Sequence, residues 1–197
     1  MFGLKELGAP LSNSEYLIRL ASISDRERVA ELRMSANLNA KTLEREGDWF
    51  EAWVGRQSED ERWGCFLVAE FETGIQAYGM VAWWSPSLVA VAPSNAVPEG
   101  YILMGVWVEP SYRRCGVASS LTRKRLDWIH ERSGEAWYWT DDDNIGSQEL
   151  HHSLGFSHYS NDFWFPGGDH SKSSLYRLSW PDEPRRIPIK PASATGE

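Results

Sequence analysis

The segment VWVEPSYRRCGVASSL joins an apolar strand to a helix through a short loop with the pattern Arg113-x-x-Gly116-x-Ala118. Small residues at 116 and 118 let the backbone approach a ligand closely. The first turn of the helix adds unpaired N–H groups and the positive end of the helix dipole, which suit a pyrophosphate. Arg113 and Arg114 can add charge-assisted contacts. Taken alone, the pattern fits an ordinary strand-to-helix turn with two solvated arginines equally well.

A second segment, NIGSQELHHSLGF, begins at Asn144, about 28 residues after Gly116. An imidazole can donate a proton near neutral pH, so His151 is a candidate acid. Packing, or a hydrogen bond to a ligand, explains His151 equally well. Two further histidines, His152 and His158, lie nearby in the sequence. No companion cysteine or carboxylate has metal-ligand spacing, so we predict no metal site.

The pair R-R-C-G-V-A and N-x-x-S-x-x-x-H-x-x-L-G-F, joined by one helix and one strand, resembles the acetyl-CoA-binding half of GNAT acetyltransferases. The family pattern is [Q/R]-x-x-G-x-[G/A], followed by an asparagine and a helix that ends in L-G-F. The resemblance covers residues 101–156 well, and the order of elements extends it to 16–180. Many members carry Tyr where this chain has His151. Aminoglycoside 6′-N-acetyltransferases and phosphinothricin-type acetyltransferases often carry His there.

The resemblance implies that acetyl-CoA is the co-substrate and that its binding site has three parts. Its pantetheine arm would pair with the central strand like an added strand, at Val106, Trp107 and Val108. Its pyrophosphate would lie on the loop and helix start formed by Arg113, Arg114, Cys115, Gly116, Val117, Ala118 and Ser119. Asn144 would hydrogen-bond the pantetheine arm, and Ser147 would assist. Arg123 and Lys124 either reach the ribose phosphate or form a solvated helix face.

The general base is harder to assign. An acceptor amine is mostly protonated at pH 7, so a proton must be removed before or during attack. Some family members use a glutamate on the central strand, where this chain has Ile102. Glu99, just before that strand, and Glu109, at its end, are the candidates to act through water. The three aspartates 141–143 could bind a cationic acceptor, although capping and loop solvation explain them, and Glu109, better.

Charge and composition limit the partners. The formal net charge is −8 and the pI is about 5.2, which argues against nucleic acid and weakly favours a cationic acceptor. The chain has no secretory signal pattern and no apolar run long enough to span a bilayer. Its two cysteines are too few for a disulfide framework, so we expect a cytoplasmic protein. Several of the 11 tryptophans are expected to line a cleft as well as the core.

The periodicity of apolar residues predicts the order β-α-α-β-β-β-α-β-α-β-β, an α/β fold with a mixed sheet and helices on both faces. The helix after Gly116 should present Val117, Leu121 and Trp128 on one face, with the basic run 123–125 largely elsewhere. The loop 85–100 is long enough to form a lid or pocket wall. We expect one domain over 15–180, a flexible arm over 1–14 and an irregular tail over 181–197.

Direct transfer of an acetyl group to a small-molecule amine is the function that these features favour. Aminoglycosides, polyamines and amino acids are examples of such acceptors. Acetylation of a protein N-terminus or lysine is the alternative, and a non-catalytic acyl-CoA-binding module is a third hypothesis, which the lack of an obvious base keeps open. Acceptor pockets come from loops that vary freely within a fold, so the sequence does not select among acceptors. The resemblance also makes a homodimer plausible.

Overall fold

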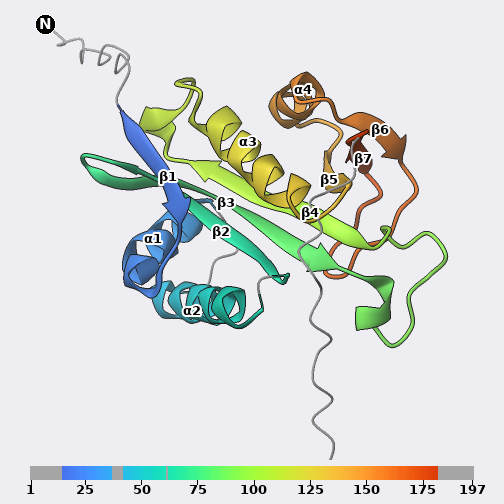
Figure 1. The fold of residues 1–197 in the computed structure, drawn as a ribbon, viewed down its shortest axis with the longest axis horizontal. Helices are drawn as coiled ribbons and strands as arrows, with labels where there is room; N and C mark the ends of the chain where they lie inside the picture. Colours follow the sequence, from blue (N-terminus) through green and yellow to red (C-terminus); the bar gives the residue numbers. More distant parts are fainter. Residues whose placement is uncertain (1–14, 37–41, 61, 182–197) are drawn as a thin grey trace, which may run out of the picture.

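The computed structural model describes residues 15–36, 42–60 and 62–181. A single mixed sheet has the strand order β1-β2-β3-β4-β5-β7-β6 (Figure 1). Its strands are β1 (Tyr16–Leu20), β2 (Gly64–Phe71), β3 (Gly74–Trp84), β4 (Gly100–Val108), β5 (Glu135–Asp141), β6 (Ser157–Ser160) and β7 (Ser173–Ser179). The helices are α1 (Arg26–Ala36), α2 (Leu43–Glu59), α3 (Val117–His130) and α4 (Ile145–Ser153), with short 3-10 turns η1 (Ile23–Asp25), η2 (Pro86–Leu88) and η3 (Pro110–Tyr112). The order of helices and strands is the predicted one. The predicted arm 1–14 and the tail, Pro181 apart, lie outside the described residues.

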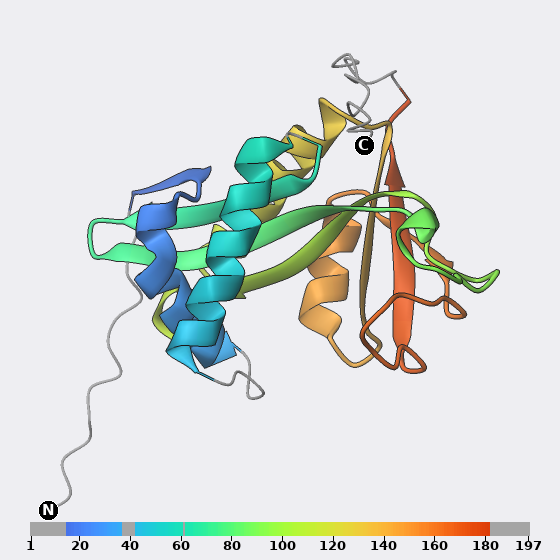
Figure 2. The same cartoon turned by 90° about the horizontal axis from the view of Figure 1, so that it is seen from below.

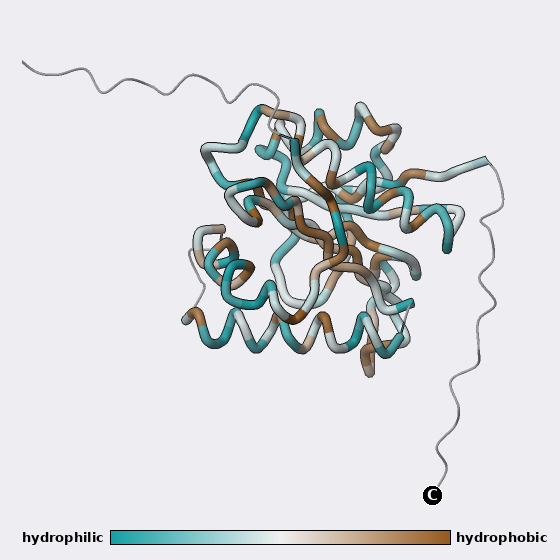
Figure 3. The backbone as a smooth tube through the Cα atoms, turned by 60° about the vertical axis from the view of Figure 1, so that its left-hand side comes forward, coloured by the Kyte–Doolittle hydropathy of each residue, from teal (hydrophilic) through white to brown (hydrophobic). Residues whose placement is uncertain are grey.

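Strands β1 to β4 form an antiparallel meander, and α3 then carries the chain across to β5, which runs parallel to β4. Strand β7 pairs with β5, and β6 forms the far edge. Helices α1 and α2 cover one face of the sheet, whereas α3 and α4 lie on the other (Figures 1 and 2). The segments with hydrophobic residues lie mainly at the centre of the domain, between the helices and the sheet (Figure 3), as expected of a three-layer domain.

Two boundaries differ from those expected. The apolar residues Leu43, Phe50 and Val54 predict a helix over 43–54 with these three on one side. Helix α2 instead continues to Glu59, and its buried side carries Phe50 and Trp53. Trp53 is buried in place of Val54 because its ring packs edge-on against Phe66 of β2, with the ring centroids 6.4 Å apart. The aromatic, strand-like sequence over 156–165 predicts an extended segment of that length, but β6 ends at Ser160. The Ser160 hydroxyl accepts a hydrogen bond from the backbone N–H of Asp162, which turns the chain there.

Candidate active site

Strands β4 and β5 diverge after two residue pairs. They are paired only at Tyr101↔Ala136 and Ile102↔Trp137, within the part of the chain that the structure describes. Beyond Ile102, β4 remains paired on its other side with β3. A gap therefore opens between two neighbouring strands at the centre of the sheet.

The backbone of β4 presents hydrogen-bonding groups to this gap. The N–H of Glu109 donates to the carbonyl of Gln76 in β3, so the backbone of Glu109 faces β3. In an antiparallel ladder the pairs alternate, so Val108 and Val106 turn their N–H and C=O groups away from β3 and toward the gap. These are two of the three positions expected to pair with a pantetheine arm. Trp107, the third, faces β3 with its backbone.

A β-bulge bends β4 where the gap begins. Gly79 is opposite Val106 and Met80 is opposite Met104, so Gly105 is an extra residue in β4. Its φ of 24° lies in a region that favours glycine. A bulge sharpens the local twist and re-aims the following residues, and here it does so beside the point where β4 leaves β5.

Two adjoining cavities occupy the gap. The inner one, of about 390 Å³, lies between the strands and is lined by Leu103, Met104, Gly105, Val106, Ala118, Arg125, Tyr138, Trp139, Thr140, Asn144, Gly146, Ser147, Leu150 and His151. The outer one, of about 590 Å³, lies at the start of α3 and is lined by Val108, Tyr112, Arg113, Arg114, Gly116, Val117, Ala118, Ser119, Ile145, Gly146, Glu149 and Leu150. Ala118, Gly146 and Leu150 line both. The two cavities therefore adjoin, with the outer one at the α3 N-terminus and the inner one at the bulge.

The outer cavity is built to receive an anion. Gly116 is the N-cap of α3, with φ at 79°, and a Cβ placed on it would meet no atom of the described residues within 4 Å. Among the described residues, none accepts a hydrogen bond from the backbone N–H groups of residues 114–119. Free donors, the positive helix end and the open space above Gly116 fit a pyrophosphate. Arg113 is already engaged, because its Nε donates to the carbonyl of Val108 at 2.8 Å and its guanidinium lies 4.5 Å from the Trp107 ring centroid.

Helix α4 supplies polar groups to the inner cavity. Asn144 caps the helix by accepting the N–H of Ser147 on its Oδ1, at 3.2 Å, which leaves the Nδ2 group free to donate to a ligand. His151, 4% exposed, lies one turn beyond Ser147. Its Nδ1 is 2.8 Å from the carbonyl of Ser147 and must carry the proton, because a carbonyl only accepts. The Nε2 atom therefore carries a lone pair.

Burial keeps the imidazole of His151 neutral. Desolvation lowers its pKa from 6.5 to about 4, against the opposing effect of the Ser147 hydrogen bond. At pH 7 only about one molecule in a thousand would carry the imidazolium. This environment favours a packing or ligand-contacting role for His151 over that of a general acid.

Tyr138 of β5 also lines the inner cavity, although neither sequence motif includes it. Its ring stacks on His151 with the centroids 3.7 Å apart, and its buried hydroxyl has no hydrogen-bond partner among the described residues. Burial raises the pKa of this hydroxyl. The alternating segment AWYWT could have indicated that Tyr138 and Thr140 share one face of β5.

The model of the acetyltransferase (GNAT) family matches residues 26–156, which is 131 of the 197 residues. The chain belongs to the GNAT family. As a GNAT enzyme it is an acetyl-CoA-dependent N-acetyltransferase, and acetyl-CoA is its co-substrate. A search among curated proteins found no match.

Solved structures share the fold of this GNAT enzyme at low sequence identity. Ribosomal-protein-alanine N-acetyltransferase from Brucella melitensis has a TM-score of 0.62 at 20% identity, covering 83% of this chain and 99% of its own. The yncA protein of Salmonella typhimurium, solved with its cofactor acetyl-CoA, has a TM-score of 0.62 at 20% identity and covers 86% and 96%. Phosphinothricin acetyltransferase from Sinorhizobium meliloti, in complex with AcCoA, has a TM-score of 0.61 at 13% identity and covers 91% and 94%. The expected α/β fold is thereby confirmed.

The carboxylates considered as bases lie away from the inner cavity of this GNAT domain. Glu99 is exposed and precedes β4 at the end where β4 and β5 are still paired, and neither it nor Glu109 lines a cavity. One Glu109 oxygen is nevertheless buried without a partner among the described residues. Asp141 and Asp142 accept hydrogen bonds from the hydroxyls of Ser173 and Ser174, so they anchor the β5 end to β7.

The basic run on α3 divides between the two faces of the helix. Arg123 and Lys124 are exposed and line neither cavity, in keeping with a solvated face. Arg125 was expected largely away from the apolar face, and this was wrong: it is 1% exposed and lines the inner cavity. The reason is spacing, because Val117, Leu121 and Arg125 follow one another at intervals of four and therefore share a face.

The described residues contain neither a candidate membrane-spanning helix nor a candidate metal-binding cluster. No helix in ranges 15–36, 42–60 and 62–181 is long and apolar enough to cross a membrane. Over the same ranges, no three residues of the types His, Cys, Asp and Glu gather in a geometry that could hold a metal ion. Of the tryptophans, Trp139 alone lines one of the two cavities.

Proposed function

We propose that this GNAT enzyme transfers the acetyl group of acetyl-CoA directly to a primary amine of a small molecule, and that the acceptor is cationic. The observation that carries the choice of a small acceptor is a fixed wall at one end of the sheet. The wall is built from the loop 85–100 and the segment 161–165, which are far apart in the sequence.

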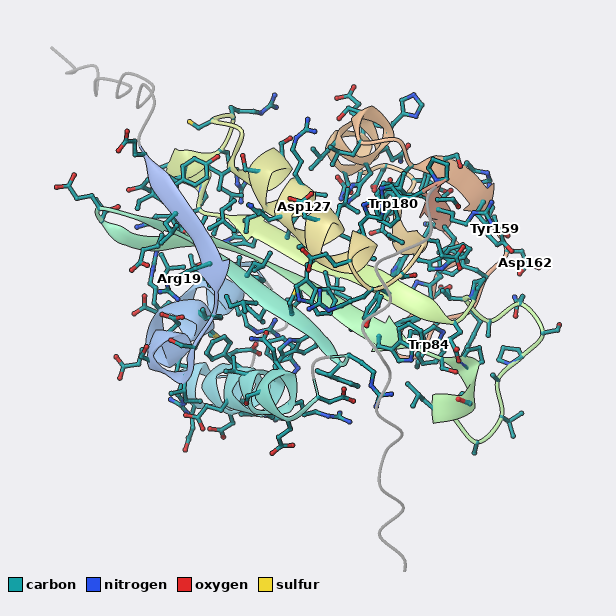
Figure 4. All side chains as sticks on the ribbon, viewed as in Figure 1. Arg19, Trp84, Asp127, Tyr159, Asp162 and Trp180 are labelled. Carbon is teal, nitrogen blue, oxygen red and sulfur yellow. The ribbon has the colours of Figure 1, made fainter. Side chains whose placement is uncertain are left out.

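Hydrogen bonds hold the two wall segments together. The N–H of Val97 donates to the carbonyl of Trp164, and the N–H of Trp164 donates to the carbonyl of Asn95, both at 2.9 Å. The indole N–H of Trp84 donates to the Val97 carbonyl, also at 2.9 Å, and the Asn95 amide donates to Asp162 at 2.7 Å. Figure 4 labels Trp84 and Asp162 at this end of the molecule.

Aromatic packing continues the wall as far as the inner cavity. Phe165 packs against Trp84 with ring centroids 4.8 Å apart and against Trp139 at 4.4 Å. Trp139 in turn lines the inner cavity. An extended peptide needs an open groove across this end of the site, so a pinned aromatic wall supports a compact acceptor. The net charge of −8 supports a cationic one.

Positioning is the main contribution that these residues would make to the reaction. The outer cavity would hold the pyrophosphate on the N–H groups around Gly116, and the N–H of Val108 and the gap-facing groups of Val106 would guide the pantetheine arm toward the bulge. The acceptor, an ammonium at pH 7, first loses one proton to water, and the neutral amine then attacks the thioester carbonyl before losing a second proton. The C–N bond forms, the C–S bond breaks, CoA leaves as the thiolate, and the second proton also passes to water. A gap-facing N–H of β4 would hold the carbonyl oxygen as its charge grows.

The side chains that line the inner cavity also indicate that positioning contributes more to the rate than acid–base catalysis does. Among the described residues, no carboxylate lines the inner cavity, so the proton would leave through water to a more distant group such as Glu109. General acid–base help is worth about 10²–10⁴ in rate, whereas holding the amine beside the thioester can contribute more. A neutral His151 would then contact the cofactor and shape the cavity, with its Nε2 available to accept a hydrogen bond.

An amine panel tests the proposal. Purified enzyme and acetyl-CoA are mixed with aminoglycosides, polyamines, amino acids and short peptides, and free CoA thiol is measured. Thiol release with a small cationic amine, and with no peptide, is the expected result. Release with N-terminal or lysine peptides alone would replace this proposal with protein acetylation. Tight acetyl-CoA binding with no release across the panel would point to a non-catalytic module.

A further inference from the structure

Arg125 is a buried guanidinium that has no carboxylate partner among the described residues. It lies on α3, two turns after the N-terminus that faces the outer cavity, and is 1% exposed. Its Nη1 donates to the carbonyls of Met80 and Met104, at 3.2 Å each, and its Nη2 donates to the hydroxyl of Thr122 at 2.8 Å. Carbonyl and hydroxyl dipoles alone therefore stabilise this charge.

Such a group is expensive to bury for packing alone. Desolvation lowers the pKa of Arg125 to about 10, so the guanidinium is still charged at neutral pH. An apolar side chain of similar volume often replaces a buried charge with no loss of stability. The presence of a charged side chain at this buried position is therefore best explained by the groups to which it donates hydrogen bonds.

Those hydrogen bonds hold the two strands at the bulge. Met80 and Met104 are the residue pair at which the register between β3 and β4 shifts, and Gly105 is the extra residue that follows. Arg125 bridges both carbonyls and so ties β3 to β4 at this point. Gly79 leaves room for it, since a Cβ there would lie 3.1 Å from the Arg125 Nε. The next residue after the bulge, Val106, is the first to turn its N–H into the gap.

We propose that Arg125 is a positioning residue for acetyl transfer, which fixes the bulge so that the Val106 N–H stays directed at the thioester. The role rests on the proposed function, because it assumes that a gap-facing N–H of β4 holds the carbonyl oxygen. Arg125 lines the inner cavity, but its Nη1 and Nη2 donors are used by the carbonyls of Met80 and Met104 and by the Thr122 hydroxyl, so it acts through the backbone. Its loss should therefore lower kcat while leaving the pyrophosphate cradle around Gly116 intact.

The test compares Arg125→Met, which keeps length and removes the charge, with Arg125→Lys. A lysine ammonium keeps the charge but lacks the second nitrogen, which in Arg125 donates to the Thr122 hydroxyl while Nη1 donates to both carbonyls, so it should rescue part of the activity. We expect kcat to fall about 30-fold or more in Arg125→Met and about 3- to 10-fold in Arg125→Lys, with the acetyl-CoA Kd within about 3-fold of wild type in both. Arg62→Met, which removes an exposed arginine paired with Asp60, is the matched control.

A second readout does not depend on the acceptor. Hydrogen–deuterium exchange of the peptide that contains β4 should be faster in Arg125→Met than in wild type, and intermediate in Arg125→Lys. A kcat in Arg125→Met within about 3-fold of wild type, or β4 exchange unchanged, would overturn the proposal. If Arg125→Met does not fold, Arg125→Lys decides: wild-type kcat overturns the role, and reduced kcat at unchanged Kd supports it. If no panel amine is acetylated, unchanged acetyl-CoA binding and the exchange data still decide the role of Arg125 in the bulge.

Discussion

The imidazole of His151 lies flat on the phenol ring of Tyr138, with the ring centroids 3.7 Å apart and the planes inclined by 14°. Tyr138 also stacks on Tyr176 of β7, at 4.8 Å, so the three rings form a continuous column beneath α4. This column covers the imidazole of His151 and shields it from solvent. It joins α4 to the sheet beside the gap, so the state of His151 affects both stability and the shape of the inner cavity.

His151 should make the protein less stable in mild acid. Its pKa is lowered from 6.5 to about 4, so the neutral form is favoured in the folded state. The stabilisation is complete above pH 6.5 and is lost as the pH falls from 6.5 to 4, by up to about 3 kcal/mol. Urea unfolding at pH 7.0, 5.5 and 4.5 measures the loss. His151→Phe keeps a stacking ring that cannot bind a proton, and it should lose less stability over this range. Parallel curves for the two proteins would contradict the assignment.

The open, uncharged space at Gly116 should be essential for binding acetyl-CoA. Gly116→Ala adds strain at a φ of 79° without a clash, which should cost about 1 kcal/mol of stability and weaken binding only slightly. Gly116→Glu adds the same strain and places a carboxylate beside the pyrophosphate, so the Kd should rise about 100-fold or more. Calorimetric titration with acetyl-CoA measures both variants. Wild-type affinity in Gly116→Glu would remove the cradle from the proposed mechanism.

Asn144 should have two separable roles. Asn144→Asp keeps an oxygen that can cap α4 and loses the amide donor, so we expect the KM for acetyl-CoA to rise about 10-fold at an unchanged Tm. Asn144→Ala also removes the cap, which costs about 1 kcal/mol. Steady-state kinetics and thermal melts are measured on both variants. An equal loss of Tm in the two would mean that the asparagine is structural only.

Trp84 should determine which acceptor amines the enzyme accepts and should not affect its affinity for acetyl-CoA. Trp84→Phe removes the donor to the buried Val97 carbonyl, which should cost about 1–3 kcal/mol and loosen the wall. The KM for the acceptor should rise and larger amines should become substrates, while the Kd for acetyl-CoA stays the same. Competition between small and large amines, followed by mass spectrometry, measures the change. A variant that weakens acetyl-CoA binding as much as acceptor binding would show that the wall does not select the acceptor.

Local patterns in the sequence determined the cofactor half of this protein. The Arg113-x-x-Gly116-x-Ala118 loop requires small residues and a helix start that are adjacent in sequence, and the structure places them around one cavity. The segment from Asn144 to Phe156 likewise carries its own cap and its own stop. Such features depend on neighbours along the chain, so spacing and residue type suffice to predict them.

Tertiary structure alone decided the rest. The gap depends on where β4 stops pairing with β5, and the wall depends on contacts between residues about 67 apart, such as Asn95 and Asp162. The charge states of His151 and Arg125 depend on what covers them, because desolvation is a property of the packed interior. A sequence shows which groups could titrate or bind. Only the fold fixes which of them are removed from water and brought to the same cavity.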